Sequence, residues 1–541
     1  MAKKLPYHNI KRALANQFPS LDYEHPKYRW WVLWNVMIGT FMAVLDATIV
    51  NVALPNLMGQ FGTTLDQIQW VMTAYLLTFG VMLPASGWLA DNFGYKKMYF
   101  LGMLLFTLGS FLCSVSWSEN VLIAFRVIQG IGGGLIMPVG MAIVMREFPI
   151  EKRGLALGLW GIAAATSISF GPYLGGFLID KVRWQAIFDI NVPIGIFGML
   201  TTLVIQREYI SQHKKAFDLI GFITMSIFLL ALLVALAEGT AEWNTGGWHS
   251  RFILSCFAIS FLFFVLFLIN EMVVNKAHPF VKLNLMKDFN FTMANFVLFI
   301  FGVGIFGSTF ILPLYLENSM GYTPLEAGTV FLFPGIVQGV ASAISGFLSD
   351  KWNPKILSFI GMVILGYSLY LNHYLYLYSS YSQIIMPLYL RGLGMGLLFT
   401  PLSKIALSNI TADQTAQASG LYNVIRQIGG SFGVAIFITI LTNKQILHTS
   451  LYGQSVINSP VFDKTKSVVQ YFVQQHAGGP THNIMNQTLA LLGTYISNTA
   501  FVSSVEDAFL ISAILTFIAL IPIIFLRISH KKASSSHTSL E

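Results

Sequence analysis

Long apolar stretches separated by short polar connections run along most of the chain. A helix needs roughly 20 mostly apolar residues to cross a bilayer, and the sequence offers about fourteen such stretches. We predict spans at approximately 31–56, 67–90, 98–117, 121–146, 153–179, 187–205, 217–237, 251–274, 290–316, 324–348, 355–375, 382–409, 414–442 and 505–528. The pattern indicates an all-α integral membrane protein with both termini on one side.

Lysine and arginine gather in every second connection, and this bias orients the spans. The basic clusters lie at 96–97, 146–153, 207–215, 276–287 and 351–355, and both tails are basic. The opposite short connections hold little beyond Lys181, Arg183 and Arg251. We therefore expect both termini in the cytoplasm and the long segment 443–504 outside, as an ordered cap.

Two short motifs occur twice. GWLAD at 87–91 recurs as GFLSD at 346–350, and GIGGGLIMP at 130–138 resembles GLGMGLLFTP at 392–401, with offsets of 259 and 262 residues. The repeat predicts two homologous halves, with a substrate site between them near the midplane. The expected organisation is a cytoplasmic tail (1–30), a six-helix bundle (31–210), an inserted helix pair (211–276), a second six-helix bundle (277–528, including loop 443–504) and a cytoplasmic tail (529–541).

Composition excludes several classes of protein. Hydrophobic residues make up 55% and charged residues 10%, whereas an ordinary soluble chain carries about 25% charged residues. The net charge of +8 resides in the clusters between spans, which argues against nucleic-acid binding. Cys113 and Cys256 lie in apolar runs, so a disulfide framework is not expected.

No fingerprint of a nucleotide, metal or catalytic site stands out. GIGGG lacks the Lys-Ser/Thr that follows in a phosphate loop, so helix packing explains it better than ATP binding. We expect no cofactor, no metal and no enzymatic activity. The proton gradient is then the natural source of energy.

Two charges lie inside predicted spans. Asp46 lies in the first span, and Arg126 lies in the fourth with Gln129 one turn further on. A charge at membrane depth costs roughly 2.5–3.5 kcal/mol on insertion scales, so each must face a cavity or a partner. The alternative is a purely structural ion pair, which is seldom the cheapest way to stabilise a bundle.

Other polar residues in the spans invite simpler interpretations. Glu317 and Lys404 lie near span ends and are expected to snorkel to the interface. Glu506 and Asp507 open the last predicted span, where acids suit a helix N-terminus. Asn423 and Arg426 are better placed for function, or for pinning the last helices together.

Six motifs carry a resemblance to a known family. They are LDATIVNVALP (45–55), GWLADNFGYKK (87–97), RVIQGIGGG (126–134), GPYLGG (171–176), WQAIFDINVPIG (184–195) and NVIRQIGGSFGVAI (423–436). In this order and spacing they resemble the signatures of the major facilitator superfamily, and more narrowly its fourteen-span drug:proton antiporters of the EmrB/QacA type. The resemblance covers nearly the whole chain.

The resemblance implies a proton-driven multidrug efflux transporter of the bacterial cytoplasmic (inner) membrane. Its partners would be protons, membrane lipid and small lipophilic drugs, often cationic, exported by alternating access. It also implies a periplasmic adaptor protein and an outer-membrane channel, reached through loop 443–504. Alternatives are a major facilitator exporter of an endogenous lipid, fatty acid or siderophore, an importer, a membrane enzyme or receptor, and an assembly component.

The resemblance, with the buried charges, selects candidate site residues. The expected proton-coupling and substrate group is Asp46, Arg126, Gln129, Asn51, Asn423 and Arg426. By analogy with the family, Arg126 pairs with Asp46, which alternates between protonated and ionised forms. Desolvation and the arginine act on this carboxyl in opposite directions.

Two further motifs are expected to control conformation. The first is a latch at the cytoplasmic end, in which Asp91 accepts from a helix N-terminus or pairs with Arg153; its residues are Gly87, Asp91, Gly94, Lys96 and Arg153. The alternative is an ordinary loop. The second is the antiporter motif, Gly171, Pro172, Gly175 and Gly176, which either seals the pathway or merely packs and kinks its helix.

The chain departs from the family pattern in three places. Lys96 or Tyr95 stands where an arginine is usual, so the charge is kept at most without a bidentate fork. The second copy of the cytoplasmic motif, SDKWNPK, lacks most basic residues and is expected to be structural only. Asp189 replaces a residue that is more often apolar, and its role stays open.

Overall fold

The computed structural model describes residues 22–210, 218–241, 243–275, 279–411, 414–457, 467–471 and 481–527. Every regular element among these residues is helical, and fourteen helical stretches are long and apolar enough to cross a membrane. The predicted fold class and number of spans are thereby confirmed. Most of the expected N-terminal tail and all of the expected C-terminal tail lie outside the described residues.

The first six spans form one bundle. They are α2 (Tyr28–Phe61), α4 (Trp70–Phe93), α5 (Tyr95–Ser114), α6 (Glu119–Glu147), α7 (Arg153–Lys181) and α9 (Asn191–Ile205), with the short helices α3 (Leu65–Ile68) and α8 (Ala186–Asp189) between them. The Ser118 side chain accepts from the backbone N–H of Val121 and so fixes the start of α6.

The other spans are an inserted pair and a second bundle. The pair is α10 (Leu219–Glu238) and α11 (Arg251–Ile269), and the bundle is α12 (Phe289–Asn318), α13 (Pro324–Lys351), α14 (Pro354–Leu371), α15 (Tyr381–Leu407), α16 (Thr415–Ile457) and α18 (Thr481–Ile518) with α19 (Leu520–Phe525). Helix starts are capped by side chains here too: Asp218 for α10, Ser250 for α11, Asp288 for α12 and Thr323 for α13.

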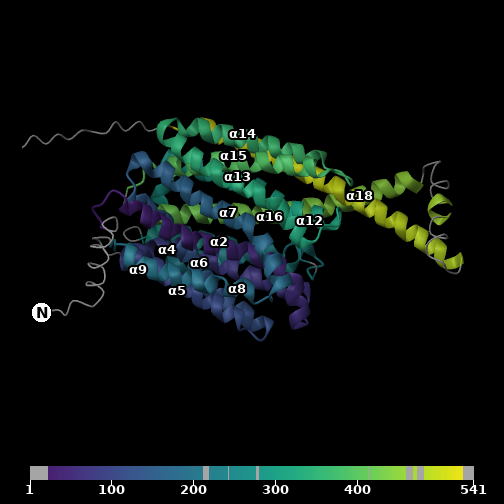
Figure 1. Cartoon of the computed structure of the whole chain (residues 1–541), viewed down its shortest axis with the longest axis horizontal. Helices are drawn as coiled ribbons and strands as arrows, with labels where there is room; N and C mark the ends of the chain where they lie inside the picture. Colours follow the sequence, from purple (N-terminus) through teal and green to yellow (C-terminus); the bar gives the residue numbers. More distant parts are fainter. Residues whose placement is uncertain are drawn as a thin grey trace, which may run out of the picture.

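The two bundles meet along two seams. In one, α7 runs beside α13 (Figure 1), and in the other α4 packs against α16. Glycines set the spacing: a Cβ on Gly158 would lie 3.0 Å from the Cα of Gly346, and one on Gly87 would lie 2.9 Å from the backbone of Gln417. Close approach at small residues is how membrane helices gain packing energy, and here it holds the halves together.

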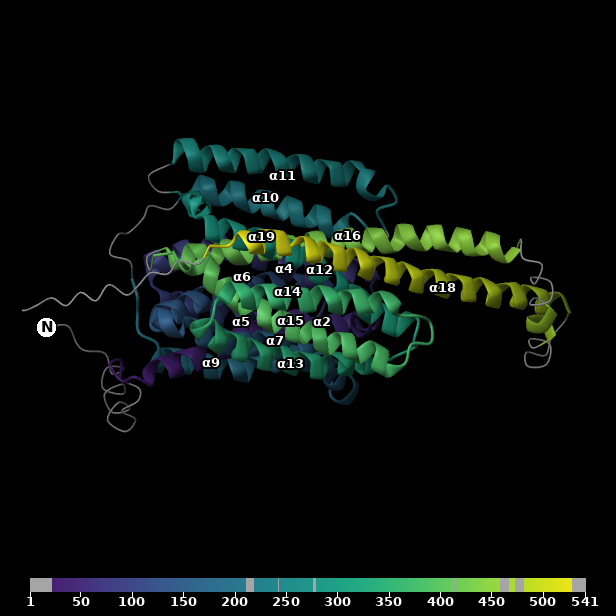
Figure 2. The ribbon, with the colours of Figure 1, turned by 90° about the horizontal axis from the view of Figure 1, so that it is seen from above.

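The inserted pair covers the second seam. Figure 2 shows α10 and α11 alongside the bundle, and α10 contacts both α4 and α16. A Cβ on Gly80 would lie 3.2 Å from the Cδ1 of Leu233, and the indole N–H of Trp248 donates to Thr439 Oγ1 at 2.8 Å. The insert therefore belongs structurally to the junction between the halves.

The last two long helices continue past the rest of the bundle. α16 runs on to Ile457 and α18 begins at Thr481, so that the pair projects as a helical hairpin (Figure 2). The helices therefore continue beyond the predicted span ends at 442 and 505, because polar helix extensions carry no apolar signal. Much of the expected outside loop 443–504 is helix.

Candidate functional site

Asp46 lies near the middle of α2 and is fully buried. Its Oδ2 accepts from Arg126 Nη1 at 2.5 Å. Its Oδ1 accepts from Gln129 Nε2 at 2.8 Å and from Asn191 Nδ2 at 3.0 Å. Both carboxylate oxygens are thus satisfied by side chains of α6 and α9, which is the arrangement an ionised carboxylate requires in a low dielectric.

Arg126 is held from several sides. Its Nε donates to the carbonyl oxygen of Val71 at 3.0 Å, and its Nη1 also donates to Gln129 Oε1 at 2.6 Å. The guanidinium carbon lies 4.2 Å from the ring centroid of Tyr75, in cation–π contact. The other contacts of Arg126 come from α4 and α6, so they hold its guanidinium in place independently of α2, which carries Asp46.

The Asp46–Arg126 pair is part of a wider buried network. The pair is electrically neutral, it is shielded from solvent, and Gln129 extends it to Ser110 Oγ at 2.6 Å. Through these bonds Arg126 and Gln129 of α6 are tied to Asp46 of α2.

Asn191 is a member of this group that the sequence argument missed. It belongs to the quoted motif WQAIFDINVPIG, is fully buried and opens α9. A buried amide within an apolar motif was the available signal. Asp189, whose role was left open, instead forms an ion pair with Arg183 at 2.9 Å, and both side chains are exposed.

The other members of the expected proton and substrate group lie elsewhere. Asn51 is exposed on α2. Asn423 donates to the carbonyl of Ser419 in its own helix α16, and the Arg426 guanidinium carbon lies 5.7 Å from the ring of Phe399. Asp46, Arg126 and Gln129 therefore form one cluster in the N-terminal half, while Asn423 and Arg426 belong to the C-terminal half.

The antiporter motif packs directly beside Asp46. A Cβ on Gly175 would lie 2.9 Å from the carbonyl oxygen of Ile49, and Gly171 abuts Thr48. On the other side, the nearest atom to a Cβ on Gly176 would be Leu325 Cδ1 at 3.2 Å, while Pro172 lies against Gly328 of α13. This stretch of α7 is therefore sandwiched between the helix that carries Asp46 and the opposite half.

The first copy of the cytoplasmic motif bonds mainly within its own half. Asp91 is buried and accepts from the Tyr95 hydroxyl at 2.8 Å, and Arg146 Nη2 donates to that hydroxyl at 2.9 Å. Arg153 donates to the carbonyl of Phe148 at 3.2 Å. The expected Asp91–Arg153 ion pair is not formed, because Arg153 is turned toward the end of its preceding loop.

Gly94 and Lys96 of the same loop contact Glu208, a residue that the sequence analysis missed. Gly94 has φ of 103°, and a Cβ there would lie 2.5 Å from the Cδ of Glu208. Glu208 accepts from the backbone N–H of Lys96 at 3.0 Å and so caps the first turn of α5. Burial raises the pKa of the Glu208 carboxyl, and the backbone hydrogen bond from Lys96 opposes this.

The second copy, which is expected to be structural only, makes a hydrogen-bonded contact between the halves. Asp350 accepts from the backbone N–H groups of Gly154 at 3.0 Å and Leu155 at 2.9 Å, at the N-terminus of α7. Lys404, in the last turn of α15, lies 2.5 Å from the same carboxylate. A carboxylate at a helix N-terminus is stabilised by the exposed N–H groups and the macrodipole.

Glu506 and Asp507 do not open a helix as expected, because α18 begins 25 residues earlier, at Thr481. Asp507 pairs with Lys444 and His448, each at 3.1 Å, and the carbonyl of Glu506 contacts His373 at 3.1 Å. These contacts join α16, α18 and the connection after α14 where the hairpin leaves the bundle. They lie outside the Asp46 cluster.

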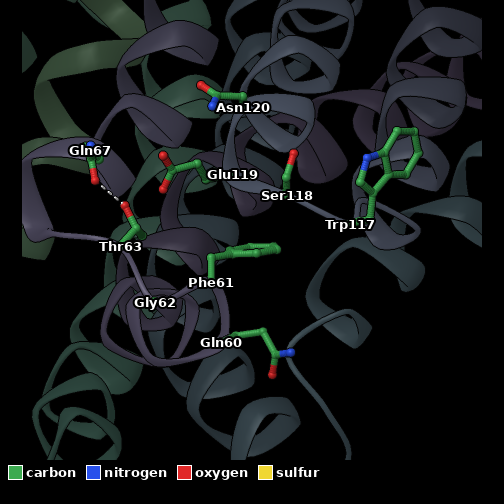
Figure 3. Close-up of a pocket in the computed structure, with 9 residues that line it drawn as sticks. All are labelled: Gln60, Phe61, Gly62, Thr63, Gln67, Trp117, Ser118, Glu119 and Asn120. Carbon is green, nitrogen blue, oxygen red and sulfur yellow. Dashed lines mark hydrogen bonds between the residues drawn. The ribbon is translucent and has the colours of Figure 1, made fainter.

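A pocket of about 360 Å³ lies at the end of the N-terminal half where α2 ends and α6 begins (Figure 3). It is lined by the turn after α2 and by the start of α6, and its labelled side chains are mostly polar. Thr63 and Gln67 form a hydrogen bond of 2.6 Å across one edge. None of the lining residues belongs to the Asp46 cluster.

Comparison with known proteins places this geometry in context. The sequence profile of the Major Facilitator Superfamily matches residues 36–434. Multidrug export protein EmrB of Escherichia coli (strain K12) is 30% identical over 479 residues, which cover 88% of this chain and 91% of EmrB. Fatty acid resistance protein FarB of Neisseria gonorrhoeae is 29% identical, covering 92% of this chain and 95% of FarB.

A further relative and a solved structure also match over nearly the whole chain. The uncharacterized MFS-type transporter YhcA of Bacillus subtilis (strain 168) is 29% identical, covering 91% of this chain and 92% of YhcA. Among solved structures, the human organic anion transporter MFSD10 superposes with a TM-score of 0.60 at 12% identity, covering 92% of this chain and 99% of that one. At this identity the superposition supports the fold alone.

Proposed function

Since the chain belongs to the major facilitator superfamily, we propose that it is a proton-driven exporter of lipophilic compounds. The observation that carries the proposal is the fully buried Asp46 carboxylate, with Arg126, Gln129 and Asn191 as its partners. An ionisable group at membrane depth costs free energy, and such groups in membrane proteins often belong to proton relays.

In the proposed mechanism, Asp46 takes up a proton from outside and its ion pair with Arg126 breaks. Helix α2 then loses its hold on α6, and the adjacent contact between Ile49 and Gly175 of α7 changes with it. At its other end α7 holds Asp350 of the opposite half. One continuous helix therefore connects the protonation site to the seam between the halves, as alternating access requires.

The link at Asp350 would act as the latch of the outward-open state. It closes the seam at the end of the bundle predicted to be cytoplasmic. Rocking toward the inward-open state must break two backbone hydrogen bonds and the contact with Lys404. The first copy of the motif, around Asp91, lies at the same end and stabilises the N-terminal half through contacts within that half.

A second candidate substrate class is supported by one relative. Multidrug export in EmrB and fatty acid resistance in FarB are the functions that these relatives' names print, at nearly equal identity to this chain. An endogenous fatty acid or similar lipid is therefore the runner-up to a broad range of drugs. Proton coupling through Asp46 would serve both.

We place the protein in the bacterial cytoplasmic membrane with both termini inside, because the basic connections lie on the termini's side. The projecting hairpin of α16 and α18 would then point outward, toward an adaptor protein and an outer-membrane channel. Exposed apolar side chains on the hairpin suit such a contact: Leu447, Leu451, Leu489, Leu491 and Tyr495.

The main test is transport by the purified protein in proteoliposomes with an imposed pH gradient. Wild type is expected to move a lipophilic dye only when the gradient is present, and Asp46→Asn is expected to lose the gradient dependence. Asp189→Asn, which removes an exposed carboxylate on the same half, is the matched control. Gradient-driven transport by Asp46→Asn at the wild-type rate would refute the mechanism.

The adaptor contact needs its own test. Shortening the hairpin beyond the helical bundle should leave transport in proteoliposomes unchanged but abolish drug resistance in cells. If resistance survives the deletion, the hairpin is not the docking element. If proteoliposome transport is also lost, the hairpin has a role within the transporter.

A further inference from the structure

Arg391 lies near the middle of α15 and is only 6% exposed. Its Nη1 is buried without a hydrogen-bond acceptor. Within the described part of the chain, no carboxylate forms an ion pair with it, and its guanidinium carbon lies 6.0 Å from the ring centroid of Phe331 on α13. A buried guanidinium whose charge is met only by an aromatic face is costly in a membrane.

Arg426 lies on the next span, α16. The Phe399 ring of α15 lies 5.7 Å from the Arg426 guanidinium carbon and 6.3 Å from the Tyr422 ring. Phe399 is eight residues from Arg391 along α15, about 12 Å at 1.5 Å per residue, so it lies between the two arginines along that helix.

Two carboxylates of the C-terminal half are paired with other cations. Asp350 pairs with Lys404 at one end of the C-terminal half, and Asp507 pairs with Lys444 at the other end. In the N-terminal half, Asp46 is held by Arg126. The middle of the C-terminal half therefore carries positive charge that the described residues do not balance.

We propose that Arg391, assisted by Arg426, binds the anionic head group of an amphiphilic organic anion, whose apolar tail lies against Phe331 and Phe399. The planar guanidinium fork matches carboxylate, sulfonate and phosphate groups, and it stays charged at any physiological pH. The inference names a substrate class for the export function proposed above and rests on that function.

The two halves would then divide the work. The proton binds in the N-terminal half at Asp46, and the anion binds in the C-terminal half at Arg391. Binding one does not require displacing the other, because Asp46 and Arg391 lie on different bundles and share no described contact. Coupling between them would pass through the α7–α13 seam, since α13 carries both Phe331 and Asp350.

The test uses the full chain in lipid nanodiscs and two probes of equal tail length. Decanesulfonate stays anionic at all working pH values, and decyltrimethylammonium stays cationic. Wild type is expected to bind the anion at least about tenfold more tightly than the cation, the effect of one charge-assisted contact. Arg391→Gln should lose that preference without weakening cation binding, Arg391→Lys should keep part of it, and Arg426→Gln should reduce it.

Arg251→Gln is the matched control, because it removes an exposed arginine at the start of α11 and should leave both affinities unchanged. Thermal melting gives a second readout: decanesulfonate should raise the melting temperature of wild type but not of Arg391→Gln. Equal affinity of wild type for the two probes would overturn the proposal. An equal loss of affinity for both probes in the folded Arg391→Gln and Arg426→Gln variants would also overturn it, because such a loss indicates a structural role.

The outcome separates this inference from the export mechanism. If Arg391-dependent anion binding is found but no pH gradient drives transport, the proton-driven mechanism fails and the anion site stands. If the gradient drives transport of the cationic and anionic probes equally, and Arg391→Gln is without effect, the anion site fails and the mechanism stands.

Discussion

In the N-terminal half, the buried guanidinium of Arg126 lies 2.5 Å from Asp46, whereas in the C-terminal half Arg391 has no carboxylate among the described residues. The two halves share a repeated glycine motif, but Arg126 lies four residues before it and Arg391 lies directly before it. The two buried arginines therefore occupy different positions of the repeat and differ in how their charge is balanced. Arg126 forms an ion pair within its own half, and Arg391 forms none among the described residues.

The cytoplasmic motif differs between the halves in a similar way. Asp91 bonds to Tyr95 one turn further along its own half, whereas Asp350 crosses the seam to the N-terminus of α7. The copy with the weaker sequence match therefore makes the hydrogen-bonded contact across the α7–α13 seam, while Gly87 of the first copy packs against Gln417 across the other seam. Sequence resemblance within a repeat is a poor guide to which copy forms hydrogen bonds across an interface.

The largest expected effect comes from breaking the balanced pair. Arg126→Met leaves Asp46 buried without a cation and should destabilise the protein by about 3–5 kcal/mol. Thermal melting of the detergent-purified protein measures the loss. The double variant Asp46→Leu with Arg126→Met should recover most of the stability without recovering transport. A single variant as stable as wild type would show that the pair is not a structural unit.

The opposite result is expected in the other half. Arg391→Met removes a buried charge that lacks a carboxylate, so the unliganded protein should be unchanged or more stable by roughly 1–3 kcal/mol. The same melting assay, run without amphiphilic anions, checks this. A loss as large as that of Arg126→Met would mean that Arg391 is balanced within the protein, and the contrast between the halves would disappear.

Asp350→Asn is expected to have an intermediate effect. It weakens the hydrogen bonds to Gly154 and Leu155 and leaves Lys404 without its carboxylate, so the seam between α7 and α13 should lose about 1–3 kcal/mol. Spin-label distances across that end of the bundle should shift toward the open population. Asp91→Asn is the comparison, and it should shift the distances less because the contact described for it lies within one half. An equal shift would contradict the assignment of the latch to the second copy.

The smallest effect concerns Glu208, which supports only the first copy of the motif. Burial raises the pKa of its carboxyl, so the folded state binds the proton more tightly than the unfolded state. Its contribution to stability is therefore full below the unfolded pKa and is lost as the pH rises through the raised value. Glu208→Gln should flatten the dependence of the melting temperature on pH in this mildly acidic window. An unchanged pH dependence would show that the carboxyl is not the source.

Much of the fold can be predicted from the sequence because long apolar stretches mark the membrane spans. The fourteen spans and the inserted pair are readable in this way. The projecting ends of α16 and α18 are not, since a polar helix outside the bilayer resembles a loop in hydropathy. Glu506 and Asp507 were placed at a helix start for that reason.

The site was only partly predictable. Asp46 and Arg126 stand out as charges within apolar runs, and family resemblance pairs them. Arg391 carries the same signal, yet the neighbouring glycines direct attention to packing instead. The partners of Asp350 could not be predicted, because the contact depends on how far α7 slides along α13, and no local pattern encodes that register.

Helix α16 has a consequence for communication across the membrane. It is one continuous helix of 43 residues, about 65 Å long at 1.5 Å per residue, running from its contact with Gly87 past Arg426 to the end of the projecting hairpin. In the proposed rocking motion it would act as a lever whose short arm is the seam between the halves and whose long arm lies beyond the bundle. Any rocking of the C-terminal half sweeps the far tip through an arc much longer than the displacement at the seam. A protein touching that tip would sense each turn of the transport cycle as a mechanical stroke.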